Sequence, residues 1–264
     1  MYAEAEIGNI VRFGPPAEGT PPGSSHRLDH DLLQRNNIVG FESASEDTHA
    51  FSVLRSQVLK HAHASGEQVF ATTSVQPGNG KTHVAVNLAA ILSRIHPTIL
   101  VELDLRRPSV GARIGLPSAH PGVEDYLSGQ APLRETAVRV EGFDLVIHRA
   151  RCPVANPEKL LASARLADMI NMIRNDDSHP ICIIDTPPGA IHHDDIMLIA
   201  PVIDGILMVV EEGRTSKHSL VETIRSLSPT PVIGSVLNRS ISSPRQTNDY
   251  DYYYALPLDS AGRS

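Results

Sequence analysis

The stretch that decides the fold is SVQPGNGKTHVAVNLAAILSRI, Ser74 to Ile95. It begins at the end of an apolar, β-branched run, QVFATTS, which predicts a strand. Its second half predicts a helix, because apolar residues recur there at helical spacing, at Val84, Leu88, Ile91 and Ile95. Strand, glycine-rich turn and helix in this order are the context in which a G-x-G-K-T sequence binds phosphate. The alternative, an ordinary glycine-rich turn with a surface lysine, does not account for that order.

The residue types in the turn suit a triphosphate. Gly78 and Gly80 let the backbone direct its N–H groups toward a phosphate, and the helix that follows adds its dipole. Lys81 can place its ammonium between the β- and γ-phosphates, and Thr82 can offer its hydroxyl to Mg²⁺. The residues predicted to bind ATP here are Gly78, Asn79, Gly80, Lys81, Thr82 and His83.

Further apolar runs alternate with segments of helical length along the rest of the chain. TILVEL, FDLVIH, PICIID, GILMVV and PVIGSVLN are short and rich in Ile, Val and Leu. Strands that are hydrophobic on both faces and joined by helices form parallel sheets with both faces covered. The sequence therefore predicts an α/β fold with a mostly parallel sheet and helices on both of its faces.

The chain divides into three regions by composition. Residues 1–44 contain GPPAEGTPPGSS and no sustained period, which is typical of a disordered, extended leader. Residues 45–240 carry the strand and helix patterns, starting with a helix on which Phe51, Leu54 and Val58 share one face. Residues 241–264 are expected to form a flexible tail. The chain is thus predicted to hold one domain with two tails.

Composition excludes several classes of function. The chain has 264 residues, a formal net charge of −7 and no run dense in Lys and Arg, so no binding to nucleic acid or anionic lipid is expected. The longest apolar stretch, IMLIAPVIDGILMVV, is broken by Pro201, Asp204 and Gly205, so no direct membrane insertion is expected. The two cysteines, Cys152 and Cys182, imply no disulfide framework and fit a reducing cytoplasm.

Carboxylates follow two of the predicted strands. PICIIDTPPG ends its strand at Asp185, and TILVELDLRRP ends its strand at Glu102 and Asp104, whose side chains point the same way in extended chain. Ligands of open α/β sheets bind at the carboxyl ends of the strands, so these acids should meet beside the phosphate loop. A lone acid at a strand end is often only a helix cap. Arg106 and Arg107 follow the second pair and could clamp a phosphate or an acidic substrate.

The order SVQPGNGKT, ILVELDLRRP, IIDTPP, SVLNR and a tyrosine-rich end resembles the bacterial tyrosine kinases of capsule and exopolysaccharide synthesis. These are P-loop enzymes with the fold of the MinD and ParA positioning ATPases. The resemblance covers about residues 46 to 254 and implies ATP and Mg²⁺ as cofactors, with Asn238 at the adenine. The expected metal ligands are Thr82, Asp104 and Asp185. The expected catalytic residues are Lys81, Glu102, Asp104, Arg106 and Asp185.

The resemblance also gives the tyrosine run NDYDYYYA an expected role. Tyr250, Tyr252, Tyr253 and Tyr254 would be autophosphorylation sites, each gaining about −1.5 to −2 charge at pH 7. The family implies a cytoplasmic protein that is held at the inner face of the plasma membrane by a membrane-embedded polysaccharide co-polymerase, or chain-length regulator, which activates it. The output would be control of polysaccharide polymerisation and export. Assembly into a homo-oligomer stays open.

Several positions depart from the family pattern. Val75 stands where the loop pattern begins with Gly, and Glu102 stands where the family usually has Asp. His49 and Ser52 replace two of three charged residues that join subunits into a ring, and only Arg55 is kept.

Two other functions are therefore weighed against the kinase. A MinD- or ParA-like positioning ATPase would carry a second lysine five residues before Lys81, where this chain has Gln76. The other alternative is a nucleotide-binding scaffold of the polysaccharide machinery with weakened catalysis.

Overall fold

The structure is a computed structural model that describes residues 24–42, 46–189 and 193–240. The four clustered tyrosines of the expected tail, residues 250 and 252–254, lie outside the described residues. The expectation of a flexible tail over residues 241–264 falls outside them as well.

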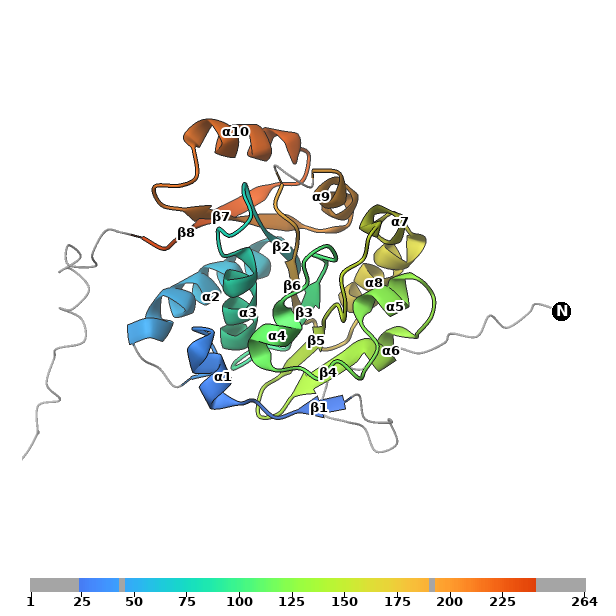
Figure 1. The fold of residues 1–264 in the computed structure, drawn as a ribbon. Helices are drawn as coiled ribbons and strands as arrows, with labels where there is room; N and C mark the ends of the chain where they lie inside the picture. The colour runs from blue at the N-terminus through green and yellow to red at the C-terminus, as the bar shows by residue number, and fades with distance from the viewer. Residues whose placement is uncertain (1–23, 43–45, 190–192, 241–264) are drawn as a thin grey trace, which may run out of the picture.

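A single eight-stranded sheet organises the described part of the chain (Figure 1). Its strands are β1 (Ser24–His26), β2 (Val69–Ser74), β3 (Thr98–Glu102), β4 (Ala137–Val140), β5 (Leu145–His148), β6 (Ile181–Asp185), β7 (Gly205–Glu211) and β8 (Val232–Asn238). The order across the sheet is β1-β4-β5-β3-β6-β2-β7-β8. All six strands expected from apolar runs are present, and β4 and β1 are additional.

The sheet is mostly parallel, as predicted. Six strands, from β5 through β3, β6, β2 and β7 to β8, run in one direction. β4 pairs antiparallel with β5, and β1 pairs parallel with β4, so these two strands run the opposite way at one edge. Because these six strands share a direction, their carboxyl ends meet along one edge of the sheet.

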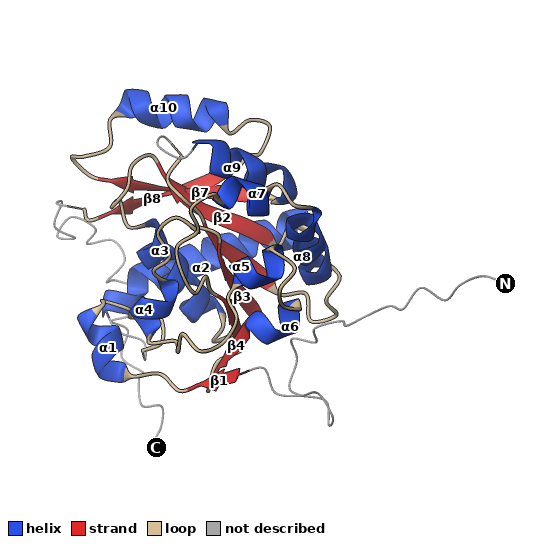
Figure 2. Ribbon diagram, turned by 45° about the vertical axis from the view of Figure 1, so that its right-hand side comes forward, coloured by secondary structure: helices blue, strands red, loops and turns tan. Residues whose placement is uncertain are grey.

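Helices cover both faces of the sheet (Figure 2). The face that carries Phe70 and Leu100 packs against α1 (His30–Arg35), α2 (Glu46–Ser65), α3 (Lys81–Leu92) and α4 (Val110–Ile114). The elements on the other face are α5 (Val123–Leu127), α6 (Leu133–Thr136), α7 (Pro157–Leu161), α8 (Ala164–Arg174), α9 (His193–Ile199), the 3₁₀ turn η1 (Ala200–Val202) and α10 (Lys217–Ser226). The predicted three-layer α/β fold is confirmed.

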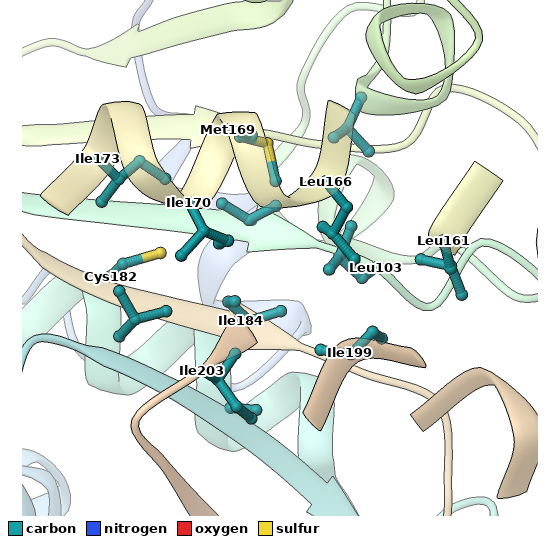
Figure 3. Packing of buried hydrophobic residues seen from close by; sticks show 14 of the residues in the cluster. Leu103, Leu161, Leu166, Met169, Ile170, Ile173, Cys182, Ile184, Ile199 and Ile203 are labelled. Carbon is teal, nitrogen blue, oxygen red and sulfur yellow. The ribbon is translucent and has the colours of Figure 1, made fainter. Parts of the chain in front are cut away.

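The packing of α8 illustrates how the sheet is covered. Figure 3 shows Ile170 and Ile173 of this helix facing Cys182 and Ile184 of β6. All four side chains are fully buried. Burial of such apolar side chains supplies most of the favourable free energy of folding. Burial raises the pKa of the Cys182 thiol far above its ordinary value, so this cysteine acts as an inert apolar group. Both cysteines are free in this structure.

The predicted apolar face of the helix after residue 45 is also confirmed. In α2, Val58 is buried, and Phe51 and Leu54 pack against the cluster that includes α3.

The expected leader over residues 1–44 is wrong for residues 24–42. β1 extends the sheet by pairing Ser24–His26 with Val138–Val140. α1 then starts at a capping Asp29, whose carboxylate accepts hydrogen bonds from the backbone N–H groups of Asp31 and Leu32. The sequence did not reveal β1 and α1, because a three-residue strand and a six-residue helix show no sustained period. The Pro- and Gly-rich residues before them also favoured the interpretation as a leader.

The same segment contributes to the core. Leu33, Ile38 and Phe41 are 1%, 0% and 5% exposed, and they pack in the cluster with α3 and α4. Phe41 also meets Phe143 edge to face, with ring centroids 4.9 Å apart. Residues 24–42 therefore belong to the folded domain.

We predict that Leu33→Ala lowers the free energy of unfolding by about 2–5 kcal/mol, the cost of truncating a buried leucine. Gln34→Ala is the matched control, because Gln34 is exposed on the same helix and should change stability little. Urea denaturation of the full chain measures both values. Equal stabilities for the two variants would mean that α1 does not pack on the domain.

Candidate active site

A cleft of about 510 Å³ opens at the carboxyl edge of the sheet, where β2, β3 and β8 end. Its lining comes from the loop after β2, the first turn of α3, the helix α4, and the segments after α1, β3, β6 and β8. The residues that line the cleft include Asn36, Asn37, Gly78, Gly80, Lys81, Thr82, His83, Asp104, Arg107, Arg113, Asn238 and Arg239. This volume lies within the usual range of small-molecule sites.

The side chain of Asn79 holds the glycine-rich loop in shape through hydrogen bonds inside the protein. The Asn79 side chain is fully buried, accepts a hydrogen bond from the Gln76 N–H at 3.0 Å and donates to the Glu211 carboxylate at 2.9 Å. Asn79 was predicted to bind ATP, but it does not line the cleft and acts through the shape of the loop. The Asn238 amide completes this frame by donating to the Asn79 carbonyl at 2.8 Å.

Gly80 cannot carry a side chain in this arrangement. Its φ is 94°, in the left-handed region, and an added Cβ would lie 2.0 Å from the Asn238 Nδ2 atom. Gly78 also has a positive φ, 85°, so the two glycines supply the turn that the sequence predicted.

Lys81 and Thr82, the first residues of α3, contact the predicted acids. The Lys81 ammonium donates to the Asp104 carboxylate at 2.6 Å and lies 3.9 Å from Asp185 Oδ1. The Thr82 hydroxyl donates to Asp185 Oδ2 at 2.7 Å. Burial alone would lower the pKa of Lys81, but the carboxylates of Asp185 and Asp104 outweigh it and raise that pKa.

Asp185 ends β6 and lies fully buried under this cluster. Burial raises the pKa of its carboxyl to about 6, against the opposing effects of the Lys81 ammonium and the Thr82 hydroxyl. Its Oδ1 atom is buried and accepts no hydrogen bond. The carboxylate therefore has an acceptor position left for a cationic ligand.

Glu102 lies away from the cleft. It pairs in register with Asp185 on the neighbouring strand, but its carboxylate accepts hydrogen bonds from three backbone N–H groups: those of Ser109, Val110 and Ala150. It is fully buried and does not line the cleft. Burial raises the pKa of Glu102 to about 8, and the nearby Asp185 carboxylate adds to the shift.

The expectation that Glu102 and Asp104 point together into the site is therefore wrong. The longer glutamate side chain reaches the backbone at the start of α4 and after β5, where it joins two loops. Asp104 alone of this pair lines the cleft.

Arg106 is also turned away from the cleft. Its guanidinium donates to both carboxylate oxygens of Asp195, at 2.6 and 3.0 Å, and to Glu158 at 3.3 Å. This bidentate pair ties the segment after β3 to α9 and α7. Its geometry indicates a role in positioning the segment that carries Asp104, not the contact with substrate that was expected of it. Arg107, its neighbour, lines the cleft instead.

His83, Asn238 and Arg239 also line the cleft, together with Asn36 and Asn37, which follow α1. Burial lowers the pKa of His83, with Arg113 and Arg239 adding to the effect, so the ring is neutral at pH 7. Sequence reasoning found His83 and Asn238 but missed Asn36 and Asn37. These two could have been found only by recognising the short helix before them.

In the described residues, no group of three or more His, Cys, Asp and Glu side chains is arranged to hold a metal ion. No helix among the described residues is long and apolar enough to cross a membrane.

Comparison with known proteins gives consistent relatives. Tyrosine-protein kinase CpsD of Streptococcus agalactiae is 28% identical over 189 residues, which are 70% of this chain and 81% of the relative. Tyrosine-protein kinase Wzc of Salmonella typhimurium is 31% identical over 201 residues, which are 73% of this chain but only 27% of that relative. Among solved structures, the chimerical protein CapA2B2 superposes with a TM-score of 0.70 at 25% identity, covering 84% of this chain and 95% of that one. No family model matches the chain.

The buried Asp185 carboxyl predicts a measurable pH dependence in metal-free protein. Its folded pKa of about 6 lies above the ordinary aspartate pKa of 3.8, so the folded state holds this proton more tightly than the unfolded state does. The resulting stability is fully present below pH 3.8 and is lost as the pH rises through 6. We therefore expect Asp185→Asn to gain melting temperature, relative to the unchanged protein, between pH 4 and pH 7.

Thermal melts in EDTA across that pH range measure the difference. Asp177→Asn is the control, because Asp177 is exposed and should show no such trend. A constant difference for Asp185→Asn across the range would contradict the buried, protonatable carboxyl.

Proposed function

The chain belongs to the bacterial tyrosine kinases, which have a P-loop fold of the MinD and ParA type, and we propose on this premise that its cleft transfers the γ-phosphoryl group of ATP to tyrosine hydroxyls. The observation that carries the proposal is the joining of Lys81, Thr82, Asp104 and Asp185 in one cluster at the start of α3. Phosphoryl transfer needs little covalent chemistry from the protein and depends on positioning and charge.

The cluster fits a magnesium ion. Mg²⁺ prefers oxygen ligands and is usually held by one or two carboxylates together with substrate phosphates and water. Thr82 and Asp185 supply a hydroxyl and a carboxylate that already lie 2.7 Å apart, and Asp185 Oδ1 accepts no hydrogen bond. Thr82 and Asp185 are therefore the residues that would hold the ion, and Asp104, which the sequence predicts as a third ligand, would instead face the γ-phosphate. When bound, it would neutralise charge on the phosphates.

Lys81 links nucleotide binding to the state of Asp104. Without nucleotide, the Lys81 ammonium is bound to the Asp104 carboxylate at 2.6 Å. A triphosphate in the glycine-rich loop competes for this ammonium, because it carries more negative charge than one carboxylate. As Lys81 turns to the phosphates, the Asp104 carboxylate is released to accept a proton.

The proposed reaction then balances with the residues of the cleft. The tyrosine oxygen forms a bond to the γ-phosphorus while the bond from that phosphorus to the bridging oxygen of ATP breaks. ADP leaves, and the phenol proton passes to Asp104. Lys81 neutralises charge on the transferred group throughout.

The C-terminal tyrosine cluster is the substrate we propose. β8 ends at Asn238, which lines the cleft, so the following residues start at the mouth of the site. Twelve residues separate Asn238 from Tyr250, a reach of about 40 Å in extended chain. That length allows the tyrosines to enter the cleft of their own chain or of a neighbour. Phosphorylation would add charge beside Asp249 and Asp251 and so repel the tail from acidic surfaces.

We also place the kinase in exopolysaccharide or capsule synthesis, in the cytoplasm, with a membrane-embedded chain-length regulator as its activator. The family resemblance supports this assignment. The output would be control of polymerisation and export through the phosphorylation state of the tail.

Incubating the full chain with ATP and Mg²⁺ and mapping phosphotyrosine by mass spectrometry tests the proposal. We expect label on Tyr250, Tyr252, Tyr253 and Tyr254, strengthened by the cytoplasmic segment of the activator, and none in Lys81→Ala. Free phosphate without label would favour a positioning ATPase, against which Gln76 already argues. Neither label nor phosphate release, with and without the activator segment, would favour a scaffold.

The two acids after β3 should separate into different roles. Asp104→Asn is expected to slow autophosphorylation by about 10²-fold or more, because it removes a proton acceptor from the cleft. It should also lower the melting temperature, because it removes the carboxylate that is paired with the Lys81 ammonium.

Glu102→Asp restores the residue that the family usually has, but its carboxylate is one methylene shorter and loses reach to Ala150 or to Val110. Each lost hydrogen bond to a buried N–H costs about 1–3 kcal/mol, so this variant should melt at a lower temperature. The reverse pattern, with Glu102→Asp stable and inactive, would show that Glu102 acts in catalysis.

A further inference from the structure

We infer that the segment Ser24–Glu42, here called the N-terminal clamp, is part of the nucleotide site, and that clamp docking and nucleotide binding are coupled. The inference deepens the proposed function and rests on it, since the ligand is the adenine nucleotide of the kinase reaction. Two clamp residues, Asn36 and Asn37, line the same cleft as Lys81 and Thr82.

On one side, α4 holds the C-terminal end of α1, which is the helix of the clamp, against the cleft. The Asn36 side chain donates a hydrogen bond to the Arg113 carbonyl at 2.9 Å, and Arg113 itself lines the cleft. The Arg113 Nε atom is buried and has no hydrogen-bond partner. A guanidinium on the lining of a cleft that should hold a polyanion suits contact with a phosphate or ribose oxygen.

From the other side the clamp is fixed to the helix of the phosphate loop. Asn87 of α3 is fully buried, and its Oδ1 atom accepts from the N–H groups of Val39 and Gly40 at 2.8 and 2.9 Å. Its Nδ2 atom donates to the Asn37 carbonyl at 3.4 Å and to the His83 carbonyl at 3.0 Å. One side chain thus joins the clamp to the first turns of the helix that carries Lys81.

Gly40 makes this docking close and breakable by a single methyl group. A Cβ at Gly40 would lie 2.5 Å from the Asn87 carbonyl oxygen and 2.7 Å from the Ala90 Cβ atom. Both contacts are far too short, and the first is with backbone that cannot move without distorting α3. Gly40→Ala should therefore displace the clamp from α3. The residues that line the cleft are all unchanged in this variant.

The chemistry of the clamp residues indicates which part of the nucleotide they would contact. Lys81 and Thr82 are expected at the phosphates and Asn238 at the adenine, and these residues share the cleft lining with Asn36 and Asn37. Asn37, held at a φ of 53°, is itself part of this lining. An amide offers both a donor and an acceptor, which suits a purine edge or a ribose hydroxyl.

Coupling has a quantitative consequence. If docking of the clamp raises nucleotide affinity by some factor, nucleotide must raise the docking equilibrium by the same factor. MgADP is the probe, because its binding does not depend on phosphoryl transfer. Isothermal titration calorimetry gives its affinity, and hydrogen exchange by mass spectrometry of the full chain gives the opening of residues 38–40 with and without MgADP.

We expect Gly40→Ala to weaken MgADP binding about 10-fold or more. Asn37→Gly keeps the backbone conformation, since glycine adopts a positive φ freely, and should weaken binding about 3- to 10-fold through the lost amide. Gly234→Ala is the matched glycine control, because its added Cβ meets only Leu207 Cδ2 at 3.6 Å, and it should bind normally. Saturating MgADP should slow exchange of residues 38–40 in the unchanged protein.

The outcomes separate this inference from the proposed function. If the unchanged protein binds MgADP but both variants bind it equally well, or exchange of residues 38–40 ignores MgADP, the coupling is refuted and the kinase proposal stands. If the unchanged protein binds no MgADP, both fall. If Gly40→Ala fails to fold, Asn37→Gly and the exchange measurement decide.

Discussion

The ion pairs of the Lys81 ammonium with Asp104 and Asp185 are the interaction on which the rest of the site depends. Three carboxylates at the ends of two neighbouring strands, Glu102, Asp104 and Asp185, are almost wholly buried, and buried charge is costly unless it is paired or hydrogen-bonded. Each is compensated in a different way. Asp104 is paired with the lysine, and Asp185 with the lysine and the Thr82 hydroxyl. Glu102, whose pKa burial raises to about 8, is hydrogen-bonded to backbone N–H groups.

This distribution divides the acids by function. A carboxylate held by a mobile ammonium can be released when a stronger anion arrives, whereas one held by three backbone N–H groups is fixed for as long as the fold lasts. Asp104 is therefore available for chemistry, and Glu102 joins the loops that shape the cleft. Arg106 has a structural role, as Glu102 does, because its bidentate pair with Asp195 connects separate elements. Arg107, and not Arg106, lines the cleft.

Sequence patterns were sufficient for the fold and for the phosphate loop. Buried parallel strands read as continuous apolar runs, and the glycine positions are dictated by positive φ angles, so both leave local signals. β1, β4 and α1 leave almost none, because they are only three to six residues long and their stability comes from pairing and burial far along the chain.

The same limit applies to the site residues. That Lys81, Thr82, Asp104 and Asp185 meet follows from parallel strands ending at one edge. The direction of the Glu102 and Arg106 side chains depends on partners at Ala150 and Asp195, which no local pattern reveals. Asn36 and Asn37 reach the cleft only because the segment before α2 folds back onto α3 and α4.

The most direct test of the account is a crystal structure of the full chain with Mg²⁺ and a non-hydrolysable ATP analogue. It should show the Lys81 ammonium moved from Asp104 onto the β- and γ-phosphates, with Thr82 and Asp185 beside the metal and Asp104 facing the γ-phosphate. A structure in which the nucleotide is bound while Lys81 keeps its 2.6 Å contact with Asp104, or in which the phosphates lie outside the loop at Gly78 and Gly80, would contradict it.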